Sequence, residues 1–261
     1  MEETNRYSLM MEAYAELKPE IESSRVLSAL LTNPPLTKVL QGLGSMPPEG
    51  LFMGVAVDGL PMLLNLQDAV PGPLLVLGDA GAGKTDLLQT IARAAGITHS
   101  PDVLQFGVMT NHPGEWNGYE QFRHSAGIFP LYADSSQEFL LTLASWARGS
   151  KTESQSVLLL IDDLEAATNL DFEARQTLRW LFLRGPARRV WPIVTLNADR
   201  SVNLQPWLEA FHTRVFGSIK DDHRAQQLMA HGANLHTLNT NAQFTLREGN
   251  HWLRFWLPSL D

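Results

Sequence analysis

Short apolar runs alternate with stretches of helical period along most of this chain. The apolar runs predict buried strands at 74–77, 103–109, 157–161 and 190–196. Apolar residues at helical spacing predict helices at 86–95, 136–148 and 171–183. We expect the first of these helices to end at Gly96 and the last at Gly185-Pro186. Such alternation is typical of an α/β fold in which helices flank a mainly parallel sheet.

Two segments have the pattern of β-hairpins instead. Apolar residues at 51–66 flank the tight-turn dipeptide Asp58-Gly59, and the tail at 243–257 alternates around the turn at 248–250. Residues 111–129 are polar and aromatic without a clear period, so we expect a loop there. The hairpins and the loop therefore lie around the α/β core.

The N-terminal part differs from the rest of the chain. Its first thirty or so residues have a helical period, and Asn33-Pro34-Pro35 ends that pattern. A turn-rich stretch at 42–50 follows. We therefore divide the chain into an N-terminal helical appendage or packing arm, residues 1–48, and a main domain, residues 49–261.

A glycine-rich turn follows the strand at 74–77 and fits the phosphate-loop pattern G-x-x-x-x-G-K-[ST] at every fixed position. Gly81 and Gly83 allow positive φ, so that main-chain N–H groups converge on phosphate oxygens. Lys84 is expected to reach the β- and γ-phosphates, and the Thr85 hydroxyl to ligate Mg²⁺. The residues predicted to bind ATP are Gly78, Asp79, Ala80, Gly81, Ala82, Gly83, Lys84, Thr85 and Asp86.

Acidic residues follow the strand at 157–161, which is the form of a Walker B strand. Asp162 is the predicted carboxylate on the magnesium side. Hydrolysis also needs a carboxylate that orients the attacking water. Asp163 is our first candidate for that role, and Glu165 is the second because it falls beyond the strand end.

The strand at 190–196 ends in polar residues beside the predicted Walker B strand. Asn197 is a candidate sensor of the γ-phosphate or of the water, and a plain turn residue is the alternative. Arginines crowd the same part of the sequence. Three interpretations of this arginine cluster remain open: a solvated helix face, a phosphate sensor or a polyanion patch. The cluster comprises Arg175, Arg179, Arg184, Arg188, Arg189 and Arg200.

Composition narrows the function classes. The net charge is −8, with 20 Lys and Arg against 28 Asp and Glu, which disfavours non-specific binding to a polyanion. The chain has no cysteine, so disulfides, thiolate nucleophiles and cysteine-based metal sites are excluded. The acidic N-terminus lacks the pattern of a signal peptide, and no apolar run has the length of a membrane span. We expect a cytoplasmic protein.

Histidines and aromatic residues give weaker signals. His231 and His236 do not share a helix face, so ordinary histidines are favoured over a metal site. Trp252, Phe255 and Trp256 fit a buried hairpin better than a base-stacking platform. We interpret them as packing residues.

An ordered set of motifs resembles the motor domain of the FtsK/SpoIIIE and HerA group of RecA-like ATPases. The resemblance covers most of residues 51–257. It implies a RecA-like P-loop NTPase fold of the ASCE type, with ATP and Mg²⁺ as ligands. The segments that carry it are the hairpin at 54–66, the lead-in strand at 73–78, and the stretches at 114–116, 127–134, 185–197, 213–218 and 222–224.

The resemblance also implies a ring, usually of six subunits, in which an arginine of one subunit completes the site of its neighbour. The family pattern has Gly-Arg where this chain has Gly185-Pro186, and glutamate where it has Asp163. The connection before the Walker B strand is short as well. The candidates for the arginine are Arg188, Arg189, Arg214 and Arg224.

Three functions remain open at this point. The first is an ATPase subunit of a ring that moves double-stranded DNA. The second is a nucleotide-dependent switch or assembly module with slow or no hydrolysis, which Asp163 would permit. The third is an FtsK-like ATPase of a protein secretion system, for which an acidic surface is no handicap. Other subunits of a larger system are expected partners in each case.

Overall fold

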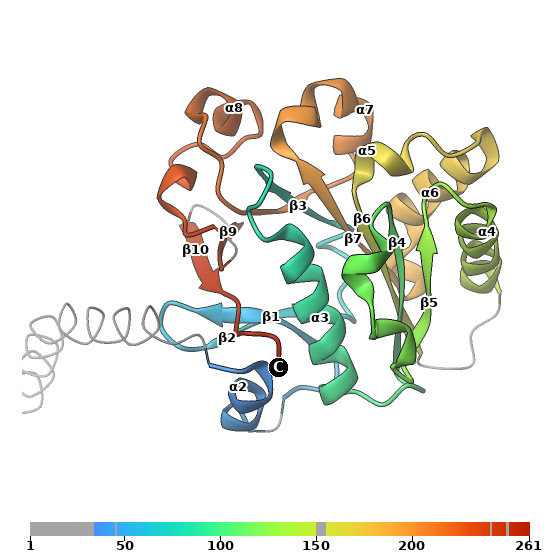
Figure 1. The fold of residues 1–261 in the computed structure, drawn as a ribbon, viewed down its shortest axis with the longest axis horizontal. Helices are drawn as coiled ribbons and strands as arrows, with labels where there is room; N and C mark the ends of the chain where they lie inside the picture. Colours follow the sequence, from blue (N-terminus) through green and yellow to red (C-terminus); the bar gives the residue numbers. More distant parts are fainter. Residues whose placement is uncertain (1–33, 45, 150–154, 241, 249–250) are drawn as a thin grey trace, which may run out of the picture.

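One ten-stranded sheet runs through the part of the chain that the computed structural model describes, which is residues 34–44, 46–149, 155–240, 242–248 and 251–261 (Figure 1). The strands are β1 (Gly50–Ala56), β2 (Pro61–Asn65), β3 (Leu74–Gly78), β4 (Leu104–Thr110), β5 (Ser125–Pro130), β6 (Ser156–Asp162), β7 (Val190–Asn197), β8 (Thr213–Phe216), β9 (Gln243–Glu248) and β10 (His251–Trp256). Their order is β2-β1-β10-β9-β8-β3-β7-β6-β4-β5.

The sheet has a parallel half and an antiparallel half. Strands β8, β3, β7, β6, β4 and β5 are parallel to their neighbours within this block. The hairpins β1–β2 and β9–β10 pair with each other and extend the sheet past β8 in antiparallel fashion. The expected α/β fold with a mainly parallel sheet and added hairpins is confirmed.

Helices connect the parallel strands and cover both faces of the sheet. The α-helices are α2 (Leu36–Gly42), α3 (Lys84–Thr98), α4 (Asp134–Arg148), α5 (Leu164–Ala167), α6 (Phe172–Arg184), α7 (Gln205–Leu208) and α8 (Asp222–Gln227). The short 3₁₀ turns are η1 (Pro113–Trp116), η2 (Tyr119–Gln121), η3 (Pro186–Arg188), η4 (Ala198–Leu204) and η5 (Leu235–Thr237).

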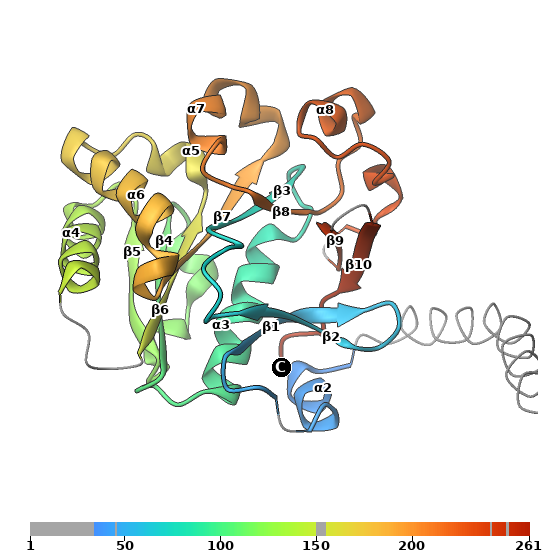
Figure 2. The ribbon, with the colours of Figure 1, turned by 180° about the vertical axis from the view of Figure 1, so that it is seen from behind.

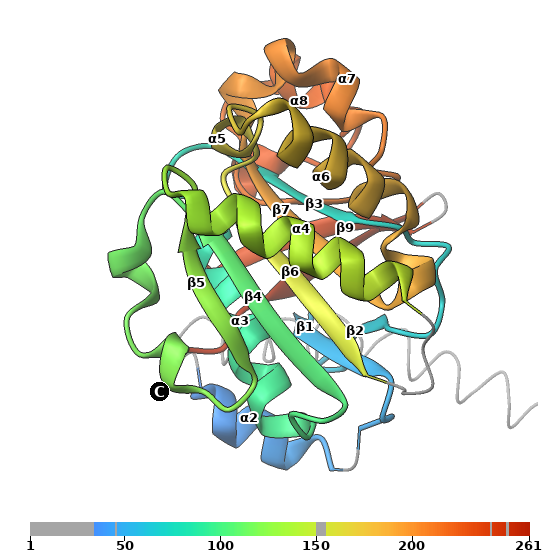
Figure 3. The ribbon, with the colours of Figure 1, turned by 90° about the vertical axis from the view of Figure 1, so that its right-hand side faces the viewer.

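The core consists of two apolar layers, one on each face of the parallel strands. All seven residues of β6 are buried, which explains its continuous apolar run. Leu159 and Ile161 belong to the layer beneath α4 and α6, whereas Leu158 and Leu160 belong to the layer beneath α3. Figure 3 shows α4 and α6 in front of the sheet and α3 behind it. This sandwich holds the carboxyl ends of β3, β6 and β7 at one edge.

Part of the predicted N-terminal appendage packs on the main domain. Leu36 and Leu40 of α2 are buried with Phe52 and with Ala94 of α3. The Leu36 N–H donates to the Ser259 carbonyl at 2.9 Å, so α2 lies beside the end of the chain (Figure 2). The described end of residues 1–48 thus packs against the main domain, and the division at residue 48 stays a prediction. The helical pattern predicted before Asn33 lies outside the described residues.

Two expectations about local structure are wrong. The loop expected at 111–129 contains the start of β5, which pairs with β4 at the edge of the sheet. β5 is only partly buried and includes Gly127 at φ 136°, so its sequence lacks a strand's alternation. Helix α3 continues past Gly96 to Thr98, because Gly96 keeps helical geometry there.

Candidate functional site

The phosphate loop forms the turn between β3 and α3. Gly81 and Gly83 have φ of 75° and 79°, which a residue with a side chain rarely adopts. A Cβ on Gly78 would lie 2.8 Å from the Ala82 Cβ, so this position also requires glycine. α3 then begins at Lys84, with its free N–H groups directed at the turn. The geometry is that of an anion-binding loop.

Lys84 is held above this loop by main-chain carbonyls. Its Nζ donates to Asp79 O at 2.8 Å and to Gly78 O at 3.2 Å. Burial lowers the pKa of the Lys84 ammonium below its usual value, and the carboxylates of Asp162 and Asp79 act in the opposite direction. The side chain therefore places a partly desolvated positive charge where phosphate oxygens would lie.

The Walker B carboxylate meets the loop directly. The Thr85 hydroxyl donates to Asp162 Oδ2 at 3.0 Å, and the Thr195 hydroxyl of β7 donates to Asp162 Oδ1 at 2.9 Å. Asp162 is 7% exposed. A buried carboxylate facing a hydroxyl is the hard oxygen donor set that Mg²⁺ prefers, so these residues fit a magnesium ion. No group of three or more His, Cys, Asp or Glu residues that suits a metal occurs among the described residues.

Asp163 has an unusual backbone and an occupied side chain. Its φ is 105°, and its N–H donates to the Thr195 hydroxyl at 2.9 Å. Its Oδ1 caps α5, because it accepts the N–H groups of Glu165 at 3.0 Å and Ala166 at 3.4 Å. Burial raises the pKa of the Asp163 carboxyl above its usual value. The first candidate for orienting water is therefore engaged as a helix cap.

A cavity of about 640 Å³ opens over the phosphate loop. Burial and the nearby Asp162 raise the pKa of Asp86, which lies at this cavity. Asn197, the candidate sensor, lines it from the end of β7. The full lining is Ala80, Gly81, Gly83, Lys84, Thr85, Asp86, Gln89, His112, Glu115, Asp162, Asp163, Thr195 and Asn197.

Several cavity residues had no role in the sequence prediction. Gln89, His112 and Glu115 line the cavity from α3 and from the turn after β4. Their place in the sequence indicates this location. The polar turn follows β4, which runs parallel to β6, so it emerges at the same edge of the sheet as Asp162. Thr195 also lines the cavity, from β7.

The other predicted acid and two of the arginines lie away from this cavity. Glu165 faces Arg200, with its Oε2 3.6 Å from the Arg200 Nε, and it does not line the cavity. Arg188 and Arg189 precede β7, whereas Asn197 ends it. Seven steps along a strand span about 23 Å, so neither arginine reaches the phosphate loop of its own chain.

Arg214 is engaged in holding the main chain together. Its guanidinium donates to the carbonyls of Phe211, Leu228 and Leu208 at 3.2, 3.3 and 3.1 Å. Burial lowers its pKa below the usual value. These contacts join β8 to α7 and to the end of α8, which favours a structural role over one as a trans-acting arginine.

Replacing this guanidinium should destabilise the fold without affecting nucleotide binding. In Arg214→Gln, partly buried carbonyls lose their donors, and we expect the free energy of unfolding to fall by about 1–3 kcal/mol. Urea denaturation measures this change, with the exposed Arg184→Gln as the control. A variant as stable as the control would contradict the structural role.

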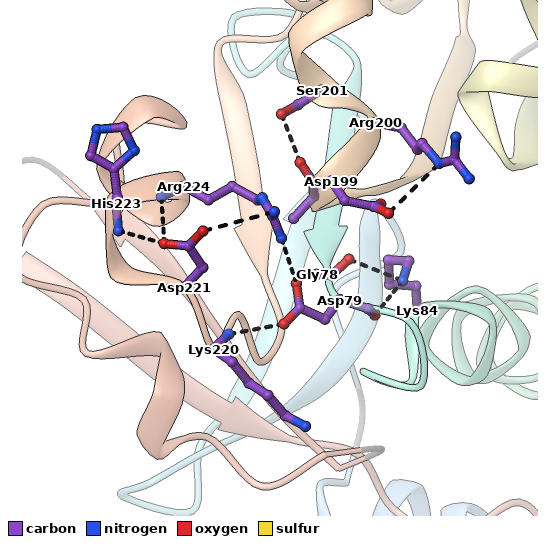
Figure 4. A network of polar contacts seen from close by, with 11 residues as sticks. Gly78, Asp79, Lys84, Asp199, Arg200, Ser201, Lys220, Asp221, His223 and Arg224 are labelled. Atoms are coloured by element: carbon purple, nitrogen blue, oxygen red, sulfur yellow. Dashed lines mark hydrogen bonds and ion pairs between the residues drawn. The ribbon is translucent and has the colours of Figure 1, made fainter.

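Arg224 lies beside the phosphate loop of its own chain (Figure 4). Its Nη1 is 3.9 Å from Asp79 Oδ1, and its Nη2 is 3.8 Å from Asp221 Oδ2. The Lys220 N–H donates to Asp79 Oδ2 at 2.9 Å, and the Asp79 N–H donates to the Ser218 carbonyl at 2.9 Å. The segment after β8 therefore supports the loop through Asp79, and Arg224 contacts that aspartate without lining the cavity.

Predicted packing residues are confirmed as such. Phe255 is 1% exposed, and Trp252 and Trp256 are partly buried and pack against the apolar clusters. Trp252 stacks edge-on against Phe216 at 5.8 Å between ring centroids. These aromatic side chains stabilise the core and the terminal hairpin.

Comparison with known sequences gives partial matches. No protein-family model matches the chain. The ESX secretion system protein EccC of Thermomonospora curvata is 35% identical over 81 residues, which is 29% of this chain and 6% of the relative. The ESX-5 secretion system protein EccC5 of Mycobacterium marinum is 27% identical over 162 residues, which is 51% of this chain. The chain therefore spans only 6% and 12% of the length of these two relatives.

Solved structures match over more of the chain. The cytoplasmic domain of the T. curvata type VII secretion ATPase EccC aligns with 87% of this chain and 28% of its own, at a TM-score of 0.65 and 14% identity. ATPases 2 and 3 of EssC from Geobacillus thermodenitrificans align with 84% of this chain and 46% of their own, at a TM-score of 0.68 and 13% identity. The pCW3 conjugation coupling protein TcpA with ATPγS aligns with 83% of this chain and 68% of its own, at a TM-score of 0.59 and 14% identity. These likenesses confirm the expected RecA-like P-loop ATPase fold.

Proposed function

We propose that this chain is an FtsK-like ATPase that binds Mg·ATP at the phosphate loop and hydrolyses it. One observation carries the proposal: the Thr85 hydroxyl of the loop lies 3.0 Å from Asp162 Oδ2 of β6, on the wall of a cavity of about 640 Å³. A glycine-rich loop, a lysine and a Walker B carboxylate are the parts that phosphoryl transfer from ATP requires.

Each residue has a distinct task in this reaction. The loop N–H groups and Lys84 bind phosphate oxygens and stabilise the negative charge that shifts as the γ-phosphoryl group leaves. Thr85 and Asp162 would hold Mg²⁺, which when bound neutralises charge on the β- and γ-phosphates. Asn197, at the end of the neighbouring strand, is placed to sense the γ-phosphate or the attacking water.

We infer that the work of the ATPase is done on a polypeptide, as part of a type VII-like secretion system. Support comes from the similarity to EccC and EccC5, which are secretion system proteins, and from the fold shared with EssC. The net charge of −8 also suits a protein partner better than DNA. This was the third of the sequence-based hypotheses, and it now replaces DNA translocation as our first.

The assembly is part of the same proposal. A ring, with six subunits as the expected number, would bring an arginine of one copy to the site of the next. Arg188 and Arg189 fit that geometry, because they lie at the opposite edge of the sheet from their own phosphate loop. No helix in the described residues is long and apolar enough to cross a membrane. We propose a cytoplasmic location for this domain because the T. curvata EccC structure that shares its fold is a cytoplasmic domain.

A second candidate function is a nucleotide-dependent switch with slow hydrolysis. It is favoured by Asp163, whose carboxylate caps α5 and whose pKa is raised by burial. Such a chain would bind ATP, organise a partner and release the nucleotide largely intact. The two functions differ in whether bound ATP is converted to ADP.

A calorimetric titration with Mg·ATP, followed by a phosphate-release assay, tests the proposal. We expect binding, steady release of phosphate, and a rate unchanged by duplex DNA. Failure to bind would contradict the ATPase proposal as a whole. Binding without release would favour the switch, and a rate that rises with duplex DNA would restore DNA as the substrate.

A further inference from the structure

Glu115 lines the nucleotide cavity from a part of the fold that belongs to neither the phosphate loop nor the Walker B strand. It lies in η1, which follows β4. In the register of the parallel strands, Thr110 of β4 is the partner of Asp162 of β6. The chain after Thr110 therefore leaves the sheet beside the magnesium-side carboxylate and carries a further carboxylate to the wall of the same cavity.

The turn that carries Glu115 is fixed at several points. The His112 N–H donates to the Thr110 hydroxyl at 3.0 Å, and the Glu115 N–H donates to the His112 carbonyl at 3.0 Å. Gln89 Nε2 of α3 donates to the Glu115 carbonyl at 2.7 Å. The next residue, Trp116, is fully buried. Glu115 thus has an anchored backbone.

The carboxylate of Glu115 has both oxygens available, whereas Oδ1 of Asp163 is occupied by the cap on α5. The Glu115 side chain is exposed at the cavity and has no hydrogen bond or ion pair with other described residues. Asp163 accepts two N–H groups of α5, and Glu165 faces Arg200 outside the cavity. Asp86 follows Thr85 in the first turn of α3, the helix that the phosphate loop opens. In-line attack needs a carboxylate that can reach a water beyond the γ-phosphate, and Glu115 enters the cavity from a separate element, the turn after β4.

We propose that Glu115 is the carboxylate that activates water for attack on the γ-phosphate, in place of a Walker B glutamate. This role rests on the proposed ATPase function. Glutamate supplies a longer reach than the aspartate at position 163, and a partner-free carboxylate can accept a proton. Asp163 then serves to shape the strand end and to start α5.

The step balances without any further reactant. Glu115 takes one proton from the water while the water oxygen forms a bond to the γ-phosphorus. The bond between the γ-phosphorus and the β–γ bridging oxygen breaks, and its electron pair remains on ADP. Inorganic phosphate and ADP leave, and Glu115 gives its proton to solvent.

The test compares Glu115→Gln with a matched control and with Asp163→Asn. We expect Glu115→Gln to lower kcat by about 100-fold or more, which is the range for a lost general base. Its Kd for Mg·ATP should stay within a factor of two of wild type, and the nucleotide recovered from the variant should be ATP. Glu120→Gln, five residues further on at an exposed site outside the cavity, should behave as wild type. Asp163→Asn should lose less than tenfold.

Two further measurements keep the outcomes distinct. The melting temperature of Glu115→Gln should match that of the control, and Glu115→Asp, which keeps a shorter carboxylate, should recover part of kcat. Wild-type hydrolysis together with an unchanged kcat in Glu115→Gln would overturn the role of Glu115 alone. Loss of ATP affinity in step with kcat would overturn it too, because it would show a binding residue. A wild-type chain that binds ATP and never hydrolyses it would overturn both this role and the ATPase.

Discussion

Lys84→Ala should abolish ATP turnover while leaving the fold intact. The Lys84 ammonium is the positive side chain at the phosphate loop in the described cavity lining, and it lies 2.8 Å from the Asp79 carbonyl. A charge-assisted hydrogen bond to phosphate contributes about 1.5–3 kcal/mol, so ATP affinity should fall by roughly 10- to 150-fold. Lys84 also stabilises charge as it moves to the leaving group, which adds a loss in kcat. The combined loss in kcat/KM should exceed about 1,000-fold.

Stability should not fall with this substitution. Burial lowers the pKa of Lys84, which means that the folded protein spends free energy on keeping the ammonium charged. Removing the charge relieves that cost and offsets the loss of the hydrogen bonds to the Gly78 and Asp79 carbonyls, so the melting temperature should change little. Calorimetry and phosphate release measure the functional loss, with exposed Lys38→Ala of α2 as the control. Turnover by Lys84→Ala at the level of that control would contradict the assigned site.

The central strands and the phosphate loop could be predicted from the sequence because they follow local rules. β6 is buried on both faces, so its apolar run is continuous and unambiguous. The loop is set by glycine at positive φ and by a fixed spacing. The fold class follows from these elements, because parallel strands with intervening helices have few alternative arrangements.

What the sequence missed depends on tertiary contacts. β5 is a half-exposed edge strand, and its pairing with β4 rather than its own pattern makes it a strand. Gly96 stays helical although glycine often ends a helix. Asp163 was predicted as an acid at the site. Its role as the cap of α5 depends on a backbone φ of 105°, which the sequence pattern does not predict. The position of Glu115 follows from the register of β4 against β6.

Thr195 shows how a single hydroxyl can organise both acids of the Walker B strand. It is 2% exposed, and its Oγ1 donates to Asp162 Oδ1 and accepts the Asp163 N–H, each at 2.9 Å. The hydroxyl thus orients the magnesium-side carboxylate and pins the strained backbone that follows it. A partner from β7 therefore fixes the end of β6.

Thr195→Val removes this hydroxyl with almost no change in shape. A buried carboxylate oxygen and a buried N–H then lose a partner, and each loss costs about 1–3 kcal/mol, so the free energy of unfolding should fall by roughly 2–4 kcal/mol. Asp162 would also be less well oriented, so turnover should require more Mg²⁺. Thr195→Ser keeps the hydroxyl and should lose much less on both counts. Urea denaturation and the Mg²⁺ dependence of phosphate release measure the two effects, and equal behaviour of the Val and Ser variants would contradict the bridging role. Thr195→Val removes the hydroxyl and keeps the methyl group, whereas Thr195→Ser removes the methyl group and keeps the hydroxyl. The two variants therefore separate the effect of the hydrogen bonds from that of methyl packing.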